Sequence, residues 1–361
     1  MLIALHEKAG IGWKTIRSIV DRVPKLSDLL LYQASDFLQM GIRPNKAEML
    51  SRISEDMIME RTRFYEARDV RLITFMDPEY PELLKRIAQP PWVIYAKGDP
   101  TLLGGFAIAM VGTRTPTVYG KQAAVDLARG LSKRGCCIVS GLARGIDTCA
   151  HLGALEGDGG TIAVLGSGLD VVYPPENRAL FSRISEEGLL LSEQPFNTSF
   201  HPGLFPLRNR IIAGLAHGTV VVEAAERSGS LITADLALEA SRDVFAVPGP
   251  IHSPKSRGTH ALIQQGAKLT ASVDDVAEEY THWFLEQNKV RPDDTRSIPT
   301  WTDDEHKIMS LLSHVPATID LLLAETGMEF GHLHSVLLSL LIKRQVVQLP
   351  GSAYIAVHNV E

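Results

Sequence analysis

Four short segments combine glycine with hydroxyl or arginine side chains, and a fifth holds two arginines. These five segments are the best candidates for chemistry in this chain. They contain Gly112, Thr113 and Arg114; Ser140, Gly141, Arg144 and Gly145; Gly166 and Ser167; Arg208, Asn209 and Arg210; and Ser228, Gly229 and Ser230. Glycine lets a ligand approach the backbone closely, and the arginine fork matches a phosphate group. Amides at helix N-termini also attract anions. Together the segments predict a ligand that carries phosphate.

The two best-known nucleotide motifs are absent from these segments. Gly120-Lys121 lacks both the upstream glycine and the following hydroxyl residue of a P-loop. Gly166 and Gly168 lack the third glycine of a dinucleotide fingerprint, and no acidic residue stands at the required distance. We therefore expect neither NAD nor ATP as a dedicated cofactor.

Catalytic constellations are sparse. The sequence has no Gly-x-Ser-x-Gly elbow and no His-Glu-x-x-His motif, and its three cysteines lack zinc spacing, so we expect no metal. Asp147 and His151 can form a base and its orienter, but a helix N-cap paired with a histidine is the favoured interpretation. Glu223 can act as a general base, cap the helix after Ser228, or brace Arg210, and we favour the last role.

The elements that position these residues are short apolar runs that alternate with helical patterns. The expected strands are Phe106–Val111, Cys136–Val139, Thr161–Leu165, Leu189–Leu191, Thr219–Val222 and Val244–Val247. Fully apolar strands between helices predict an α/β fold, a Rossmann-like, doubly wound and mainly parallel sheet over residues 66–284. Ligands of such sheets bind beyond the carboxyl ends of the strands, where the glycine segments fall.

Two smaller modules flank this sheet. Residues 1–65 read as short helices around Gly10 and Gly12, similar to a SAM or helix-hairpin-helix module, whose glycines either meet a phosphate or merely turn the chain. Residues 285–300 are polar and aperiodic, which is typical of a linker. Residues 301–361 predict three helices and a hairpin with its turn at Pro350-Gly351, a winged-helix-like module that opens with a capping box at Thr302. Its net charge of −4 favours a contact or packing role over duplex binding.

Composition limits the partners. The 361 residues are 45% hydrophobic and 22% charged with a net charge of −6, and no segment is a basic block. A nucleic-acid site must therefore be a local pocket with a few arginines. No apolar run approaches membrane-spanning length and the start does not resemble a signal peptide, so we expect a cytoplasmic protein with reduced thiols and no membrane partner.

The motifs resemble, in order, those of the DNA-processing protein A family, also called DprA or Smf. The resemblance covers about residues 80–270 and rests on Tyr80–Leu84, Pro91–Gly98, Val111–Arg114, Ser140–Asp147, Ala150-His151, Gly166–Asp170, Arg208–Ile212, Ser228–Ala234 and Val247–Gly249. It implies a cytoplasmic homodimer that binds single-stranded DNA and loads the RecA recombinase onto it during natural transformation. It also implies no enzymatic activity and no cofactor, and it makes Arg114 the main phosphate contact.

Two functions follow from these observations. The leading one is a non-catalytic binder of single-stranded DNA in which Tyr173 and Phe205 stack unpaired bases and the Rossmann-like domain forms the dimer. The alternative is an enzyme that acts on a nucleotide, such as a nucleoside monophosphate phosphoribohydrolase. In that case Glu223 and Arg210 would work as an acid–arginine pair.

Overall fold

The computed structural model describes residues 1–284, 302–312, 316–343, 345–349 and 353–356. The expected linker at 285–300 and the expected turn at Pro350-Gly351 lie outside these residues. The chain forms two compact units, Met1–Gln287 and Asn288–Glu361. The first unit contains both the expected N-terminal module and the expected Rossmann-like domain.

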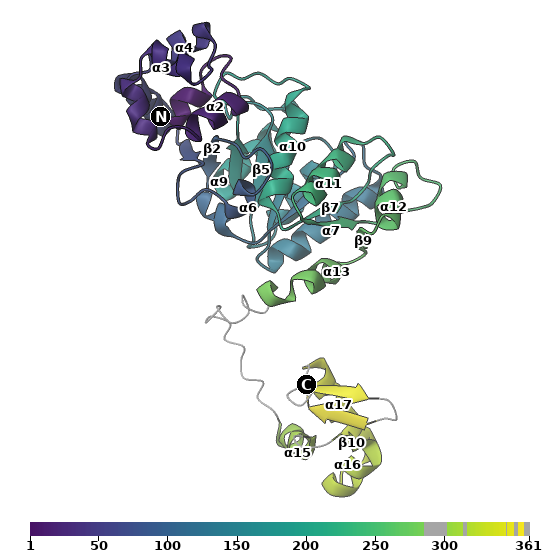
Figure 1. Cartoon of the computed structure of the whole chain (residues 1–361). Coiled ribbons are helices and arrows are strands. Elements are labelled where there is room, and N and C mark those ends of the chain that lie inside the picture. The colour runs from purple at the N-terminus through teal and green to yellow at the C-terminus, as the bar shows by residue number, and fades with distance from the viewer. Residues whose placement is uncertain (285–301, 313–315, 344, 350–352, 357–361) are drawn as a thin grey trace. The chain divides into compact units, whose positions relative to one another are not determined.

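A nine-stranded sheet forms the centre of the described part of the first unit, in the order β1-β2-β6-β5-β4-β3-β7-β8-β9 (Figure 1). Its strands are β1 (Arg71–Thr74), β2 (Val93–Gly98), β3 (Ala107–Val111), β4 (Cys137–Ser140), β5 (Thr161–Leu165), β6 (Leu189–Ser192), β7 (Gly218–Val221), β8 (Asp243–Ala246) and β9 (Lys268–Leu269). All neighbours from β6 to β9 are parallel, whereas β2 is antiparallel to both β1 and β6. The expected mainly parallel, Rossmann-like sheet is confirmed, and each expected strand lies within two residues of an observed one.

Helices cover both faces of this sheet because its central strands are apolar on both sides. The helices are α6 (Glu82–Lys85), α7 (Val118–Lys133), α8 (Ile146–Ala154), α9 (Arg178–Glu187), α10 (Leu204–Leu215), α11 (Gly229–Glu239), α12 (Arg257–Gln264) and α13 (Val273–Ala277), with short 3-10 turns at η2 (Pro100–Gly104), η3 (Pro175–Asn177) and η4 (Glu278–Tyr280). On one face α7 and α8 pack on β3, β4 and β7, and on the other face α10 and α11 pack on the same strands. All residues of β3, β4 and β5 are buried, as a doubly covered sheet requires.

The N-terminal helices pack on one end of the sheet. They are α1 (Leu2–His6), α2 (Trp13–Val20), η1 (Leu26–Leu31), α3 (Ala34–Gln39), α4 (Pro44–Leu50) and α5 (Glu55–Glu66). The Trp13 indole donates to the Pro90 carbonyl at 2.7 Å and stacks on Trp92 with centroids 5.7 Å apart. Gly10 has a φ of 76°, so the first glycine makes the turn that leads into α2. The module therefore shares a hydrophobic core with β2, β5 and β6.

The second unit is a winged-helix domain. Its described elements are α15 (Asp303–Leu312), β10 (Ala317–Thr318), α16 (Ile319–Thr326), α17 (Phe330–Ile342), β11 (Val346–Leu349) and β12 (Ala353–Ala356), with strand order β10-β12-β11. The expected capping box is present, because the Thr302 amide donates to Glu305 and the Glu305 amide donates to the Thr302 hydroxyl. No helix among the described residues is both long and apolar enough to cross a membrane.

Candidate nucleic-acid interface

The glycine segments meet at the carboxyl end of the parallel strands, around the point where the strand order reverses. The chain runs from β3 outward through β4, β5 and β6, and then returns to β7 on the other side of β3. This switch point is where open α/β sheets bind their ligands. Two adjacent hollows lie here, and Arg114, Ala143 and Phe205 line both of them.

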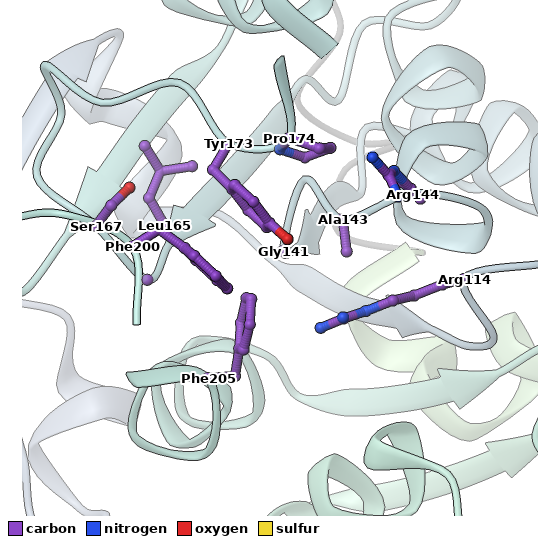
Figure 2. Close-up of a pocket in the computed structure, with 11 residues that line it drawn as sticks. Arg114, Gly141, Ala143, Arg144, Leu165, Ser167, Tyr173, Pro174, Phe200 and Phe205 are labelled. Atoms are coloured by element: carbon purple, nitrogen blue, oxygen red, sulfur yellow. The ribbon is translucent and has the colours of Figure 1, made fainter. Parts of the chain in front are cut away.

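The first, which we call the aromatic hollow, has a volume of about 50 Å³ (Figure 2). It is lined by Arg114, Gly141, Ala143, Arg144, Leu165, Gly166, Ser167, Tyr173, Pro174, Phe200 and Phe205. The Tyr173 and Phe200 rings stack with centroids 3.8 Å apart and an interplanar angle of 8°. Phe205 completes the group at 4.9 Å from Phe200. Tyr173 and Phe205, the two aromatic residues expected near the rim, both line this hollow, and their stacking on bases stays a prediction. Phe200 was missed because it lies in a loop without any periodic pattern.

Two arginines reach this aromatic hollow from neighbouring loops. The exposed Arg114 guanidinium lies 4.7 Å from the centroid of the Phe205 ring, a cation–π contact, and points toward the aromatic group in Figure 2. Arg144 is 60% exposed and forms an ion pair with Glu176. The hydrogen bond from Arg144 lowers the pKa of Glu176, so this carboxylate remains charged. Its ion pair with Arg144 competes with any phosphate for the guanidinium.

The second, which we call the helix-end hollow, has a volume of about 350 Å³ and lies beside the N-terminus of α11. It is lined by Val111, Gly112, Thr113, Arg114, Ala143, Asp147, Phe205, Pro206, Arg208, Asn209, Ile212, Ser228, Gly229, Ser230, Ile232 and Thr233. The Ser228 side chain caps α11 by accepting from the Ser230 amide. Segments from four different parts of the sequence therefore meet in one cavity, as the strand-end argument predicted.

The loop after β4 is held by side chains beneath it. Asp147 accepts hydrogen bonds from the amides of Gly141 and Ala143 at 3.2 and 3.3 Å. His151 lies 3.3 Å from the Leu142 amide through Nε2 and 2.7 Å from the Thr161 hydroxyl through Nδ1. The expected pairing of Asp147 with His151 is wrong, and so is the N-cap role of Asp147, because Gly145 holds that position.

Both groups take these roles because a buried loop must have its backbone amides satisfied. Burial raises the pKa of Asp147, although the charge of Arg208 and the two amides oppose the shift. Burial and the Arg208 charge lower the pKa of His151 to about 3. His151 is therefore neutral at physiological pH, and both residues position the loop.

Arg208 lies under the same loop and is only 6% exposed. Its Nη1 donates to the Val164 carbonyl at 2.8 Å, whereas its Nε has no partner. A Cβ added to Gly141 would lie 1.6 Å from Nη1, so only glycine leaves room for the guanidinium. Burial lowers the pKa of Arg208 to about 10, which still leaves it charged at neutral pH.

Three other expected contacts are not in the hollows. The buried Ser140 hydroxyl donates to the Met110 carbonyl, and Gly145, with a φ of 82°, packs against the Thr113 carbonyl. Arg210 pairs with Glu193 and bonds to the Gln89 carbonyl, away from both cavities. Ser140 and Gly145 therefore support the loops, and the expectation that Arg210 lines the pocket is wrong.

Glu223 does not brace Arg210. Its two carboxylate oxygens accept from the amide and hydroxyl of Thr117 at 2.9 and 2.6 Å, and the side chain is buried. It thereby fixes the start of α7 rather than the helix after Ser228. The acid–arginine pair on which the enzyme alternative depended is not formed. The described residues also contain no group of three His, Cys, Asp or Glu that could hold a metal ion.

Comparisons with known proteins identify the family. Residues 71–281 match the model described as DNA recombination-mediator protein A, and residues 292–352 match the DprA winged helix domain. DNA processing protein DprA of Bacillus subtilis is 46% identical over 216 residues, which are 60% of this chain and 73% of that protein. Protein Smf of Escherichia coli is 35% identical over 320 residues, 87% of this chain and 84% of the relative.

Two solved structures agree with this result. The X-ray structure of DNA processing protein A from Streptococcus pneumoniae has a TM-score of 0.68 and 37% identity, and covers 77% of this chain and 96% of its own. The protein of the same name from Helicobacter pylori, described for its single-stranded DNA binding mode, has a TM-score of 0.54 and 32% identity over 59% of this chain and 96% of its own. This chain belongs to the DprA/Smf family of DNA recombination-mediator proteins.

Proposed function

We propose that this chain binds single-stranded DNA along the rim formed by the two hollows and delivers it to the RecA recombinase. One observation supports this most directly: Arg114 and a group of three aromatic rings share one cavity at the strand ends. Arginine and backbone amides suit the phosphates, and an aromatic face suits any unpaired base. The role is binding, since Asp147 and Glu223 are both occupied in holding loops.

The charge distribution favours a single strand over a duplex. The chain carries a net charge of −6, so no general positive field attracts the duplex backbone. Nonspecific binding of single strands instead combines local cations with stacking surfaces, which is the combination at this rim. The relative from Helicobacter pylori, described for its single-stranded DNA binding mode, supports the same assignment.

Arg114→Ala tests the proposal. We expect the variant to bind fluorescent oligo-dT more weakly, with the log–log salt slope reduced in magnitude by about 0.7 for each phosphate that the arginine neutralises. Fluorescence anisotropy over a range of salt concentrations measures both quantities. Arg183→Ala is the matched control, because Arg183 is an exposed arginine paired with Glu187 on α9, outside both hollows. Equal affinity of Arg114→Ala and wild type would refute the site.

Two further parts of the proposal concern assembly. We propose a homodimer through the Rossmann-like domain, which would present one continuous strand to the recombinase. In support, β9 is the last strand of the sheet, and Leu238 and Leu269 are 57% and 48% exposed near it. Light scattering gives the mass in solution. RecA assembly on a strand precoated with single-strand-binding protein, with and without this protein, measures delivery.

A further inference from the structure

We propose that the helix-end hollow binds a phosphate monoester, either the terminal phosphate of a DNA strand or a free nucleoside monophosphate. The inference deepens the proposed function, because a strand held by Arg114 passes directly into this hollow. The terminal phosphate would then lie between Arg114 and the start of α11, and the rest of the strand would continue into the aromatic hollow. The protein would thereby distinguish strand ends from internal positions.

The walls of the helix-end hollow present donors with open space before them. α11 is eleven residues long. Its Ser230 and Leu231 amides bond to the Ser228 hydroxyl and carbonyl, which leaves the Gly229 amide as the first-turn donor available to an anion. A Cβ added to Gly229 would meet no heavy atom within 4 Å, so the first residue of α11 faces unoccupied volume. The Ser228 and Ser230 hydroxyls lie 2.7 Å apart at the same wall.

An independent observation is a buried cation among the residues that line this hollow. Arg208 is 94% shielded from solvent, and its Nε donor has no partner although the side chain lines this hollow. An unpaired donor on a buried guanidinium is unfavourable in the free protein, and an anion in the hollow would compensate its charge. Asp147 is the only carboxylate among the lining residues.

The charge balance favours a dianion. Arg208 and Arg114 contribute one positive charge each and the end of α11 about half a charge, against at most one negative charge from Asp147, which leaves a net of at least about +1.5. A phosphodiester carries a single negative charge, whereas a monoester carries about −1.5 to −2 at neutral pH. The monoester therefore matches the helix-end hollow more closely than the DNA backbone does. The volume of about 350 Å³ also leaves room for more than a lone phosphate.

The first experiment compares ends and sources. Oligo-dT with a 5′-phosphate, with a 3′-phosphate and with hydroxyls at both ends is titrated against the wild-type chain, and dTMP is titrated separately by calorimetry. We expect one phosphorylated end to bind about three- to thirtyfold more tightly than the hydroxyl form. A preference for one end assigns the site to strands, and dTMP binding assigns it to free nucleotides. Equal affinities of all three oligonucleotides together with no dTMP binding would overturn the proposal.

A pair of variants then locates the effect. Gly229→Asp puts a carboxylate into the open space at the start of α11, and Gly229→Asn adds a neutral side chain of the same shape. We expect the Asp variant to lose the end preference or the dTMP binding, and the Asn variant to keep it. An end preference that survives Gly229→Asp would place the terminal phosphate elsewhere and contradict the assignment.

The proposed function fails separately from this inference. The proposed function is refuted if Arg114→Ala binds the hydroxyl-ended strand as tightly as wild type does. In that case, dTMP binding still tests whether the helix-end hollow binds a phosphate monoester. The pH dependence offers a further check, since the second pKa of a monoester is about 6. The preference should shrink as pH falls through that value, and a preference that grew instead would contradict a dianion site.

Discussion

Replacing Phe205 by leucine tests whether the rim stacks on bases as well as binding phosphates. The ring is half-buried, borders both hollows and lies under the Arg114 guanidinium at 4.7 Å from its centroid. Leucine keeps apolar contact with Phe200 and removes the aromatic face. Base stacking on an aromatic ring contributes about 1–3 kcal/mol, which predicts a loss of roughly five- to 150-fold in affinity for oligo-dT.

Part of that loss comes from Arg114 rather than from a base, and an abasic strand separates the two. An exposed cation–π contact contributes about 0.5–1 kcal/mol, so the same variant should bind an abasic oligonucleotide only about two- to fivefold more weakly. Fluorescence anisotropy with both strands gives the two ratios. Phe330→Leu is the control, because Phe330 is 61% exposed in the winged-helix unit. Equal losses on both strands would show that Phe205 only positions Arg114, and the stacking argument would fail.

Two further predictions concern carboxylates. Glu176→Gln removes the ion pair of Arg144 and leaves the guanidinium available for phosphate. The affinity for oligo-dT should therefore rise a few-fold at low salt and converge with that of wild type at high salt. Weaker binding of the variant in anisotropy titrations would contradict this. In the winged helix, burial tends to raise the pKa of Glu305, but hydrogen bonds from Lys343, Ser339 and the Thr302 amide outweigh it and lower the pKa to about 2 from 4.5. Its contribution to stability is therefore full above about pH 4.5 and lost as pH falls toward 2. Thermal unfolding monitored in the winged-helix unit should show this loss in wild type and a flatter pH profile in Glu305→Gln.

The strand-end arrangement could be predicted because the segments that begin at Gly112, Ser140 and Gly166 directly follow apolar runs. Runs such as Thr161–Leu165 identify buried parallel strands, and parallel strands bring their carboxyl ends to one edge. The strands β1 and β2 were not expected, because they are antiparallel additions at the sheet end covered by the N-terminal helices. The burial of their side chains depends on the covering N-terminal helices, so the alternation of strands and helices along the chain does not predict them.

The errors among the site residues have two causes: the direction in which a helix points its side chains, and the competition of nearby backbone amides for side-chain acceptors. Arg208 and Arg210 are two residues apart on α10, which turns side chains by about 200°, so one enters the rim and the other faces Glu193. This could have been predicted once α10 was recognised as a helix. Asp147 and His151 have the spacing of a pair, but nearby buried amides compete for both. Sequence spacing does not report such competition.

Three features that sequence rules do not favour lie at this rim. Leu142 has a φ of 55°, a conformation that non-glycine residues rarely adopt, and Arg208 is buried with an unpaired donor. The stacked Tyr173 and Phe200 rings are only half-buried. Each feature is unfavourable for the stability of the isolated fold, and the first two lie within the loop after β4 or directly beneath it. Residues that act against stability persist where they bind a ligand. An anionic strand would compensate the charge of the Arg208 guanidinium and cover the exposed rings, so one ligand would offset both features.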